Sequence, residues 1–232
     1  MEVAREEGVR GPVVGAWRFA SHVARARRAA RELRRETADL SSLEEAVALA
    51  ERFESDGIRI RPGQERSEIL RLLEIVRVER PKVVLEIGTK FGGSLYLLAR
   101  AAPSDALLVS IDIPHGYHVS LGVLYRSFAH GRQRVRLVRA DSHDAATLRR
   151  VKTILRRRQV DLLHIDGDHT AEGVRADYAM YGPLVRSGGL IAFHDLVLPG
   201  VAALWEELEG EKTEIVADPN QRTCGFGLLR RT

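Results

Sequence analysis

A chain of 232 residues with 44% hydrophobic side chains can bury one full core and a small helical appendage. The single cysteine, Cys224, excludes an internal disulfide, and no apolar run approaches the length of a membrane span. The net charge of +4 is concentrated in an arginine-rich N-terminal segment without interleaved aromatic side chains, which favours a solvated helix face over a nucleic-acid patch.

The first residues of the chain carry mixed charges. Glu2, Arg5, Glu6 and Glu7 stand where a signal peptide would need a basic start and an apolar core, so we expect a cytoplasmic protein with no membrane partner. The clustered arginines follow at Arg25, Arg27, Arg28, Arg31, Arg34 and Arg35.

Residues 1–62 are predicted to be a helical extension without a sheet of its own, ahead of a main domain at residues 63–232. Residues 42–45 fit a capping box before a short helix that ends near Phe53, and Gly57 supplies a stop. So small a segment is not expected to fold alone. It would pack on the main domain as a cap over a cofactor, a wall of a substrate cleft or a contact between subunits.

From about residue 65 onward, apolar strands alternate with amphipathic helices, which is the pattern of a doubly wound α/β domain with a Rossmann-like, mostly parallel sheet of seven strands. The connection at residues 218–224 is too short for a crossover helix, so the last two strands should form an antiparallel hairpin. The predicted strands are 83–87, 106–111, 135–139, 160–165, 190–193, 213–217 and 225–229.

A glycine-rich turn follows the first of these strands and opens a helix. Backbone amides at such a turn face a nucleotide-like ligand, and glycine lets the ligand approach closely. The spacing Glu-x-Gly-x-x-x-Gly-Gly differs from the dinucleotide fingerprint Gly-x-Gly-x-x-Gly, which weakens a pyrophosphate interpretation. Glu86-x-Gly88 resembles the first motif of class I S-adenosylmethionine (AdoMet) methyltransferases, whose cofactor has an amino-acid tail and no phosphate. A parallel sheet finished by a hairpin resembles their fold.

Polar side chains gather at the carboxyl ends of the predicted strands, where open α/β sheets bind their ligands. Four strand ends that supply carboxylates and imidazoles to one crevice indicate a site rather than isolated caps and turns. These residues are Asp112, Asp141, Ser142, His143, Asp166, Asp168, His169, His194 and Asp195. A long connection at 114–131, with His115, Tyr117, His118, Tyr125 and Phe128, offers a lid or an acceptor wall.

The nucleoside part of AdoMet needs acceptors at the ends of the second and third strands. Asp112 is placed to accept hydrogen bonds from the two ribose hydroxyls. Asp141 and Ser142 resemble the position that holds the adenine amino group in this fold. The competing interpretation of Asp112 and Asp141 is turn chemistry, which aspartate often serves.

The methionine part of AdoMet would lie against the glycine-rich turn. Gly88 would allow the close approach, and Glu86 would order the turn or approach the ammonium through water. Gln64, just before the first helix of the main domain, is a further candidate for the carboxylate end.

Residues 164–169 and 181–195 resemble the metal-dependent O-methyltransferases related to cephalosporin-biosynthesis methyltransferases and macrolide-sugar O-methyltransferases, over about residues 64–230. The resemblance implies that Asp166 and Asp195 hold Mg²⁺ and that His169 acts as the catalytic base. His194 stands where the family often has an acidic residue. Because imidazole suits Mn²⁺, Fe²⁺ or Zn²⁺ better than Mg²⁺, His194 as a ligand puts the identity of the metal in question.

These features together predict an AdoMet-dependent O-methyltransferase that acts, with metal assistance, on a hydroxyl of a small molecule such as a sugar or natural product. A protein of this kind would be a homo-oligomer with no nucleic-acid partner. Two alternatives stay open from the sequence. The arginines prompt an RNA or DNA methyltransferase, against which the Asp166–His169 sequence argues because base-methylating families often carry Asn/Asp-Pro-Pro-aromatic there. The other alternative is a non-catalytic AdoMet-binding protein.

Overall fold

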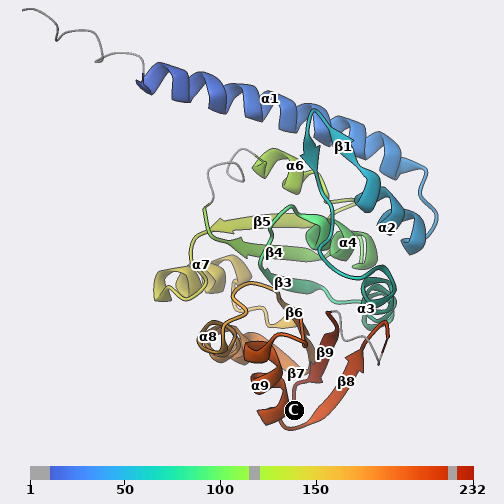
Figure 1. Cartoon of the computed structure of the whole chain (residues 1–232), viewed down its shortest axis with the longest axis vertical. Helices are drawn as coiled ribbons and strands as arrows, with labels where there is room; N and C mark the ends of the chain where they lie inside the picture. The colour runs from blue at the N-terminus through green and yellow to red at the C-terminus, as the bar shows by residue number, and fades with distance from the viewer. Residues whose placement is uncertain (1–10, 115–120, 219–223) are drawn as a thin grey trace, which may run out of the picture.

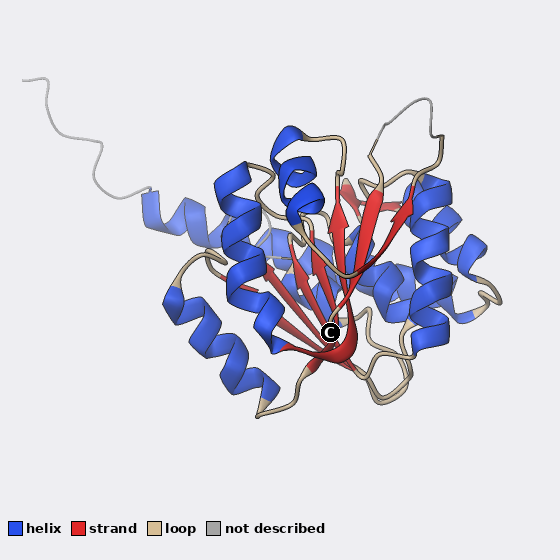
Figure 2. Ribbon diagram, turned by 90° about the horizontal axis from the view of Figure 1, so that it is seen from below, coloured by secondary structure: helices blue, strands red, loops and turns tan. Residues whose placement is uncertain are grey.

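The computed structural model describes residues 11–114, 121–218 and 224–232, and within residues 11–18 only the backbone. A central sheet runs through the molecule with helices on both of its faces (Figure 2). Its strands are β3 (Val83–Ile87), β4 (Leu107–Asp112), β5 (Arg134–Arg139), β6 (Val160–Ile165), β7 (Val185–His194), β8 (Glu211–Ile215) and β9 (Phe226–Arg230).

The seven strands lie in the order β5-β4-β3-β6-β7-β9-β8. All neighbours are parallel except β9, which pairs antiparallel with both β7 and β8. The predicted doubly wound, mostly parallel sheet with a C-terminal hairpin is therefore confirmed. The chain progresses outward from β3 through β4 and β5 and then returns to β6 on the other side of β3. A ligand crevice is expected at this reversal, beyond the carboxyl ends of β3 and β6.

The bounds of β4, β5 and β9 differ from the prediction by one residue, and those of β7 and β8 differ by more. β7 begins at Val185 rather than residue 190, because Gly188 N donates to Arg231 O at 2.7 Å and Arg231 N donates to Gly189 O at 2.9 Å. β8 spans Glu211–Ile215 rather than 213–217, because its antiparallel pairing with β9 runs from Glu211 opposite Arg230 to Ile215 opposite Phe226.

Two layers of helices bury the two faces of the sheet. One apolar core joins α3, α4 and α6 to one face, and a second core joins α7, α8 and α9 to the other. Alternate residues of β3 show the division, since Val84 lies in the first core and Leu85 in the second. The helices are α3 (Arg66–Glu79), α4 (Gly93–Ala101), α6 (Gly122–Arg126), α7 (Ala145–Leu155), α8 (Ala171–Tyr181) and α9 (Pro199–Glu207), with a 3₁₀ turn at Gly182–Leu184.

The N-terminal region is not purely helical, which corrects the prediction. After α1 (Gly11–Ala38) and α2 (Leu43–Arg52), a small antiparallel hairpin pairs β1 (Glu54–Ser55) with β2 (Ile58–Arg59). Gly57 (φ 75°) follows Asp56 (φ 50°) in the two-residue turn of this hairpin and does not stop a helix, because both positions need the left-handed conformation.

The capping of α2 follows the sequence closely. Ser42 accepts a hydrogen bond from Glu45 N at 3.2 Å, as the capping box predicts, while the Glu45 carboxylate accepts from Ser41 N at 2.7 Å, one residue earlier than expected. α1 lies along α6 and the β1–β2 hairpin and extends beyond the body of the molecule (Figure 1). Among the described helices, none combines the length and the apolar character that crossing a membrane requires.

Residues 61–64, called the strap below, connect the hairpin to α3 and pass directly over the start of α4. A Cβ on Gly93 would overlap the backbone of Ile60 and Pro62, so the strap packs against the first residue of α4. The N-terminal region therefore reaches the carboxyl edge of the sheet. Of the roles expected for it, this contact supports the cover over the cofactor or the wall of the cleft. The domain boundary at residue 62 stays a prediction.

Candidate active site

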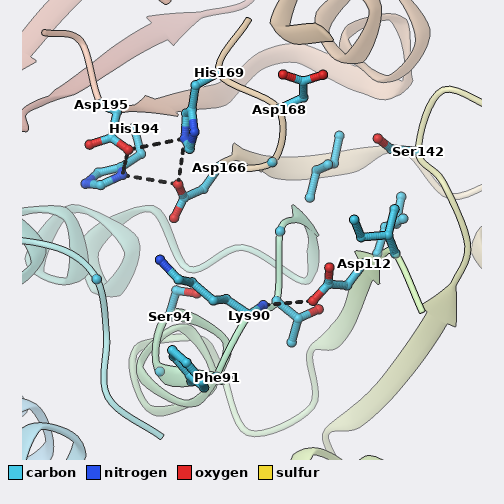
Figure 3. Close-up of a pocket in the computed structure, with 18 of the residues that line it drawn as sticks. Lys90, Phe91, Ser94, Asp112, Ser142, Asp166, Asp168, His169, His194 and Asp195 are labelled. Carbon is cyan, nitrogen blue, oxygen red and sulfur yellow. Dashed lines mark hydrogen bonds and ion pairs between the residues drawn. The ribbon is translucent and has the colours of Figure 1, made fainter. Parts of the chain in front are cut away.

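A pocket of about 550 Å³ opens beyond the carboxyl ends of β3, β4, β5, β6 and β7, where the order of the strands reverses (Figure 3). Its volume lies within the roughly 300–1,000 Å³ typical of small-molecule sites. The predicted site residues that line it are Gln64, Gly88, Asp112, Asp141, Ser142, Asp166, His169, His194 and Asp195. The sheet thus brings together all the predicted site residues except Glu86.

The glycine-rich turn is held by the strands on either side of it. Gly88 has φ 96°, and a Cβ there would overlap the carbonyl of Asp166, so the neighbouring strand end requires glycine. Gly88 also lines the pocket. On the other side, Asp112 Oδ2 accepts a hydrogen bond from Lys90 N at 2.9 Å. Asp112 thus fixes the turn, and its predicted role at the ribose stays a prediction.

Glu86 lies outside the pocket, which corrects its place among the cofactor contacts. Its side chain is fully buried, and its two carboxylate oxygens accept hydrogen bonds from Ser94 (2.7 Å) and Ser110 (2.6 Å). These bonds connect β3 to the first turn of α4 and to β4. Of the two roles predicted for Glu86, the structure supports ordering of the turn and not an approach to the ammonium.

Asp141 and Ser142 line the part of the pocket beyond β5. Asp141 Oδ1 accepts a hydrogen bond from His143 N at 2.9 Å, so this carboxylate serves the turn chemistry that was the alternative to ligand binding. Ser142 is fixed through its carbonyl, which accepts from Tyr181 Oη at 2.7 Å. His143, which also lines the pocket, follows in the same turn, and contact of these residues with adenine stays a prediction.

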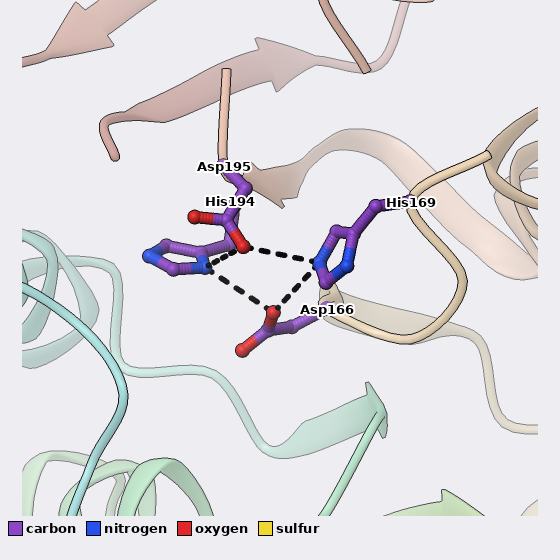
Figure 4. Close-up of side chains that lie close together, drawn as sticks. All are labelled: Asp166, His169, His194 and Asp195. Atoms are coloured by element: carbon purple, nitrogen blue, oxygen red, sulfur yellow. Dashed lines mark hydrogen bonds and ion pairs between the residues drawn. The ribbon is translucent and has the colours of Figure 1, made fainter. Parts of the chain in front are cut away.

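Four side chains from the ends of β6 and β7 and from the loop before α8 form a closed ring at one edge of the pocket (Figure 4). His169 Nε2 lies 3.2 Å from Asp166 Oδ1 and 3.2 Å from Asp195 Oδ2. His194 Nδ1 lies 3.2 Å from the same Asp166 oxygen and 3.3 Å from the same Asp195 oxygen. Nitrogen and oxygen atoms therefore alternate around the ring.

Each member of the ring has a shifted pKa. Burial acts against the charge on Asp166, but hydrogen bonds from His169 and His194 outweigh it and hold the pKa of Asp166 well below its ordinary value. Burial similarly opposes the charge on His194, yet Asp166 and Asp195 raise the pKa of His194 to about 9. The hydrogen bond with Asp166 also raises the pKa of His169, while the pKa of Asp195 is lowered against burial by His194.

The donor set of the ring fits a divalent metal ion. The four ligand atoms lie within 4.8 Å of one another. First-row metals bind imidazole nitrogen and carboxylate oxygen at about 2.0–2.2 Å, so neighbouring donors around such an ion are about 3 Å apart, close to the contacts of the ring. The imidazole of His194 beside the two carboxylates suits Mn²⁺, Fe²⁺ or Zn²⁺ better than Mg²⁺, which prefers oxygen ligands.

The two histidines of the ring differ in access. The side chain of His194 is 3% exposed and that of His169 is 33% exposed, so only His169 has a substantial surface open to the pocket. His169 lies just before α8 and does not cap it. Thr170 is the N-cap and accepts from Gly173 N at 3.0 Å, while Asp168 accepts from Thr170 N at 2.8 Å.

Tyr125 and Phe128 do not form an acceptor wall, which corrects the expectation for the long connection. They are buried against Gly92 in the core beside α4, and Tyr125 Oη donates to Lys90 O at 2.9 Å. His115, Tyr117 and His118, the other candidates of that connection, lie outside the described residues.

Sequence reasoning missed two cationic residues of the pocket wall, Arg61 in the strap and Lys90 in the glycine-rich turn. Lys90 stands inside the motif that predicted the cofactor site, and its position between two glycines of a ligand-binding turn was the available signal. The position of Arg61 depends on the packing of the strap on α4, which has no counterpart in the sequence pattern.

Comparison with known proteins agrees with this geometry. A family model described as a methyltransferase domain matches residues 85–196, from β3 to the end of the ring of four side chains. The uncharacterised protein y4gI of Sinorhizobium fredii is 28% identical over 145 residues, which make up 58% of this chain and 16% of that protein. The chain thus spans a small part of the length of this curated relative.

Two solved structures share the fold. The O-methyltransferase TomG of Streptomyces achromogenes, involved in tomaymycin synthesis and solved with AdoMet, has a TM-score of 0.56 and 19% identity, covering 84% of this chain and 92% of TomG. An O-methyltransferase of Bacillus cereus with S-adenosylhomocysteine has a TM-score of 0.58 and 18% identity, covering 83% of this chain and 93% of that one.

The order of the strands and the pocket at their reversal agree with the methyltransferase-domain model, and the fold is that of the two solved O-methyltransferases. The match over residues 85–196 includes the glycine-rich turn and the ring.

Proposed function

We propose that this protein is an O-methyltransferase that methylates a hydroxyl of a small molecule, with a divalent metal held by Asp166, His194 and Asp195 and with His169 as the base. The observation that carries the proposal is the ring of these four side chains at the edge of the pocket. The description of both solved neighbours as O-methyltransferases supports oxygen as the acceptor atom, and the involvement of TomG in tomaymycin synthesis supports a natural-product acceptor.

The cofactor would occupy the part of the pocket along β3, β4 and β5. Asp112 would accept from the ribose hydroxyls, Asp141 and Ser142 would hold the adenine, and Gly88 would border the methionine chain. When bound there, AdoMet supplies an electrophilic methyl group on a sulfonium sulfur. With the cofactor held by these residues, that group would face the ring, because the turn that holds Gly88 packs directly on the backbone of Asp166.

The ring would activate the acceptor. A hydroxyl group loses its proton with difficulty near neutral pH and therefore needs a base, a cation or both. His169 has the accessible imidazole, which would take the proton as the oxygen attacks the methyl carbon. Asp166 and Asp195 orient His169 from one side of the ring, and the buried His194 completes it. A bound divalent ion supplies positive charge that lowers the cost of forming the alkoxide.

A small acceptor suits this pocket better than a nucleic acid. The strap covers one side of the pocket, and the charged lining is mostly aspartate, which would repel a phosphate backbone. Two of the arginines that prompted the alternative have partners in the β1–β2 hairpin. Arg25 donates to the carbonyl of Asp56, and Arg28 lies 3.1 Å from the Asp56 carboxylate.

Formation of S-adenosylhomocysteine from AdoMet, measured over a panel of sugar and aromatic hydroxyl compounds, tests the proposal. We expect turnover with some members of the panel, its loss after exhaustive chelation, and recovery with Mn²⁺ or Fe²⁺ in preference to Mg²⁺. Turnover that survives complete chelation would exclude the metal, and methylation of nitrogen or nucleic acid alone would exclude the hydroxyl acceptor.

A further inference from the structure

Two further polar residues line the pocket, Gln64 in the strap and Lys90 in the glycine-rich turn. Gln64 Nε2 donates a hydrogen bond of 2.7 Å to Asp166 Oδ2, which fixes the orientation of the side-chain amide. The amide oxygen is buried and accepts no hydrogen bond from any described residue. A buried acceptor without a donor is unfavourable, so this oxygen is suited to a ligand that brings an N–H group.

Lys90 lines the same pocket as Gln64. Its backbone is fixed at both ends, since its N–H donates to Asp112 and its carbonyl accepts from Tyr125. The side chain extends from the turn toward the side of the pocket that holds Asp166 (Figure 3). A Cβ on Gly63 would lie 3.9 Å from Lys90 Nζ, so the ammonium is next to the residue that precedes Gln64.

The charges of the pocket explain why this cation matters. Five aspartates line the pocket, and its lysine and arginine side chains are Lys90 and Arg61, so an anionic group of a ligand is best placed beside one of these two cations. Within the described chain, the ammonium of Lys90 forms no ion pair with a carboxylate. It is available to a ligand carboxylate at the start of α4, where the helix N-terminus also favours negative charge.

We propose that Lys90 and Gln64 form the subsite for the α-amino acid end of the cofactor, an inference that rests on the proposed cofactor pocket. Lys90 Nζ binds the carboxylate, and Gln64 Oε1 accepts a hydrogen bond from the ammonium. This assignment revises the expectation that Gln64 meets the carboxylate, because both the carboxylate and Gln64 Oε1 are acceptors and the amide nitrogen is already bonded to Asp166.

Calorimetry with three ligands tests the carboxylate contact. S-Adenosylhomocysteine carries both charged groups, its decarboxylated analogue keeps only the ammonium, and methylthioadenosine lacks both. In Lys90→Met we expect S-adenosylhomocysteine to bind about 10- to 100-fold more weakly, as for a lost charge-assisted hydrogen bond, while the two other ligands bind as they do to the wild type. Lys90→Arg should restore most of the loss, and Lys82→Met, a surface lysine paired with Asp105, should change nothing.

Gln64→Leu tests the ammonium contact with the same ligands. We expect it to remove the advantage of the decarboxylated analogue over methylthioadenosine, a comparison that cancels any general effect of the substitution on the adenosine part. An equal loss for all three ligands in Lys90→Met, or no loss for any, would overturn the subsite while leaving the cofactor pocket in place. Binding of neither S-adenosylhomocysteine nor methylthioadenosine to the wild type would overturn the pocket and the subsite together.

Discussion

The side-chain amide of Gln64 donates a hydrogen bond of 2.7 Å to Asp166, which joins the strap to a carboxylate 102 residues later in the chain. Asp166 also contacts both histidines of the ring, as Asp195 does. The strap that follows the N-terminal region therefore shares one polar network with the ring at the pocket. Removal of the region through the strap should disturb the ring as well as the cover of the pocket.

His169→Gln tests the base directly. Glutamine keeps the approximate size and hydrogen bonding of histidine but cannot take a proton, so turnover should fall about 10²- to 10⁴-fold while the affinity for S-adenosylhomocysteine stays within twofold. Single-turnover kinetics with calorimetry measures both quantities. Near-normal turnover would remove His169 from the base role and direct attention to His143 and to His115 and His118.

Thr170→Ala is the matched control for His169→Gln. It removes the cap of α8, whose side chain accepts from Gly173 N, and should lower the free energy of unfolding by about 1 kcal/mol. Turnover per folded molecule should be unchanged. If Thr170→Ala lowers turnover as strongly as His169→Gln, the effect of both substitutions reflects the position of the loop rather than proton transfer.

Asp112→Ala should weaken binding of S-adenosylhomocysteine by roughly 1–3 kcal/mol, because the ribose hydroxyls would lose their acceptor. The glycine-rich turn would also lose its contact with Lys90 N. Asp105→Ala removes only an exposed ion pair with Lys82 and serves as the control. Unchanged affinity in Asp112→Ala, measured by calorimetry, would exclude the ribose contact.

Gly88→Ala should destabilise the fold by more than about 3 kcal/mol, because a side chain at φ 96° is strained and its Cβ would overlap the carbonyl of Asp166. Gly63→Ala is the control in the strap, where a Cβ meets no described atom closer than Lys90 Nζ at 3.9 Å. Urea unfolding of both variants measures the difference. Equal stability of the two variants would show that the turn does not pack on Asp166 as described.

Because the carboxyl of Asp177 is buried, we predict that the free energy of unfolding depends on pH through this group. Burial raises the pKa of this fully buried carboxyl above its unfolded value, although His143 Nε2, 3.4 Å away, opposes the shift. A raised carboxyl pKa contributes stability that is complete below about pH 3.9 and is lost as the pH rises through the folded value. The stability of Asp177→Asn relative to the wild type should therefore increase from about pH 4 to pH 7.

Urea unfolding at several pH values measures this trend. Asp105→Asn should give a smaller trend of the opposite sign, because the hydrogen bond from Lys82 lowers the pKa of Asp105. A stability difference for Asp177→Asn that is independent of pH would contradict the assignment.

Regular elements were predictable because their signals are local. β3 and β6 have the predicted bounds from end to end, since each is a short, mostly apolar segment that ends at a glycine or an aspartate. The ring at Asp166 and Asp195 was predictable as well, because carboxyl ends of adjacent parallel strands meet at one edge.

Features that depend on packing between distant segments were not predictable. The β1–β2 hairpin is too short to give a strand pattern, so Gly57 was interpreted as a helix stop. The sequence places Glu86 at the edge of the glycine-rich turn, but only the neighbouring strand and α4 supply the two serine hydroxyls that hold it in the core. Tyr125 was assigned to a lid for the same reason, since its burial against Gly92 is a long-range contact.

The most direct test of the account is a crystal structure with S-adenosylhomocysteine and Mn²⁺, with anomalous scattering used to locate the metal. We predict one anomalous peak within about 2.0–2.3 Å of Asp166, His194 and Asp195, with the ribose of the cofactor on Asp112. An anomalous map without a peak among these residues, or S-adenosylhomocysteine bound away from Asp112, would contradict a metal-assisted methyltransferase site at this edge of the sheet.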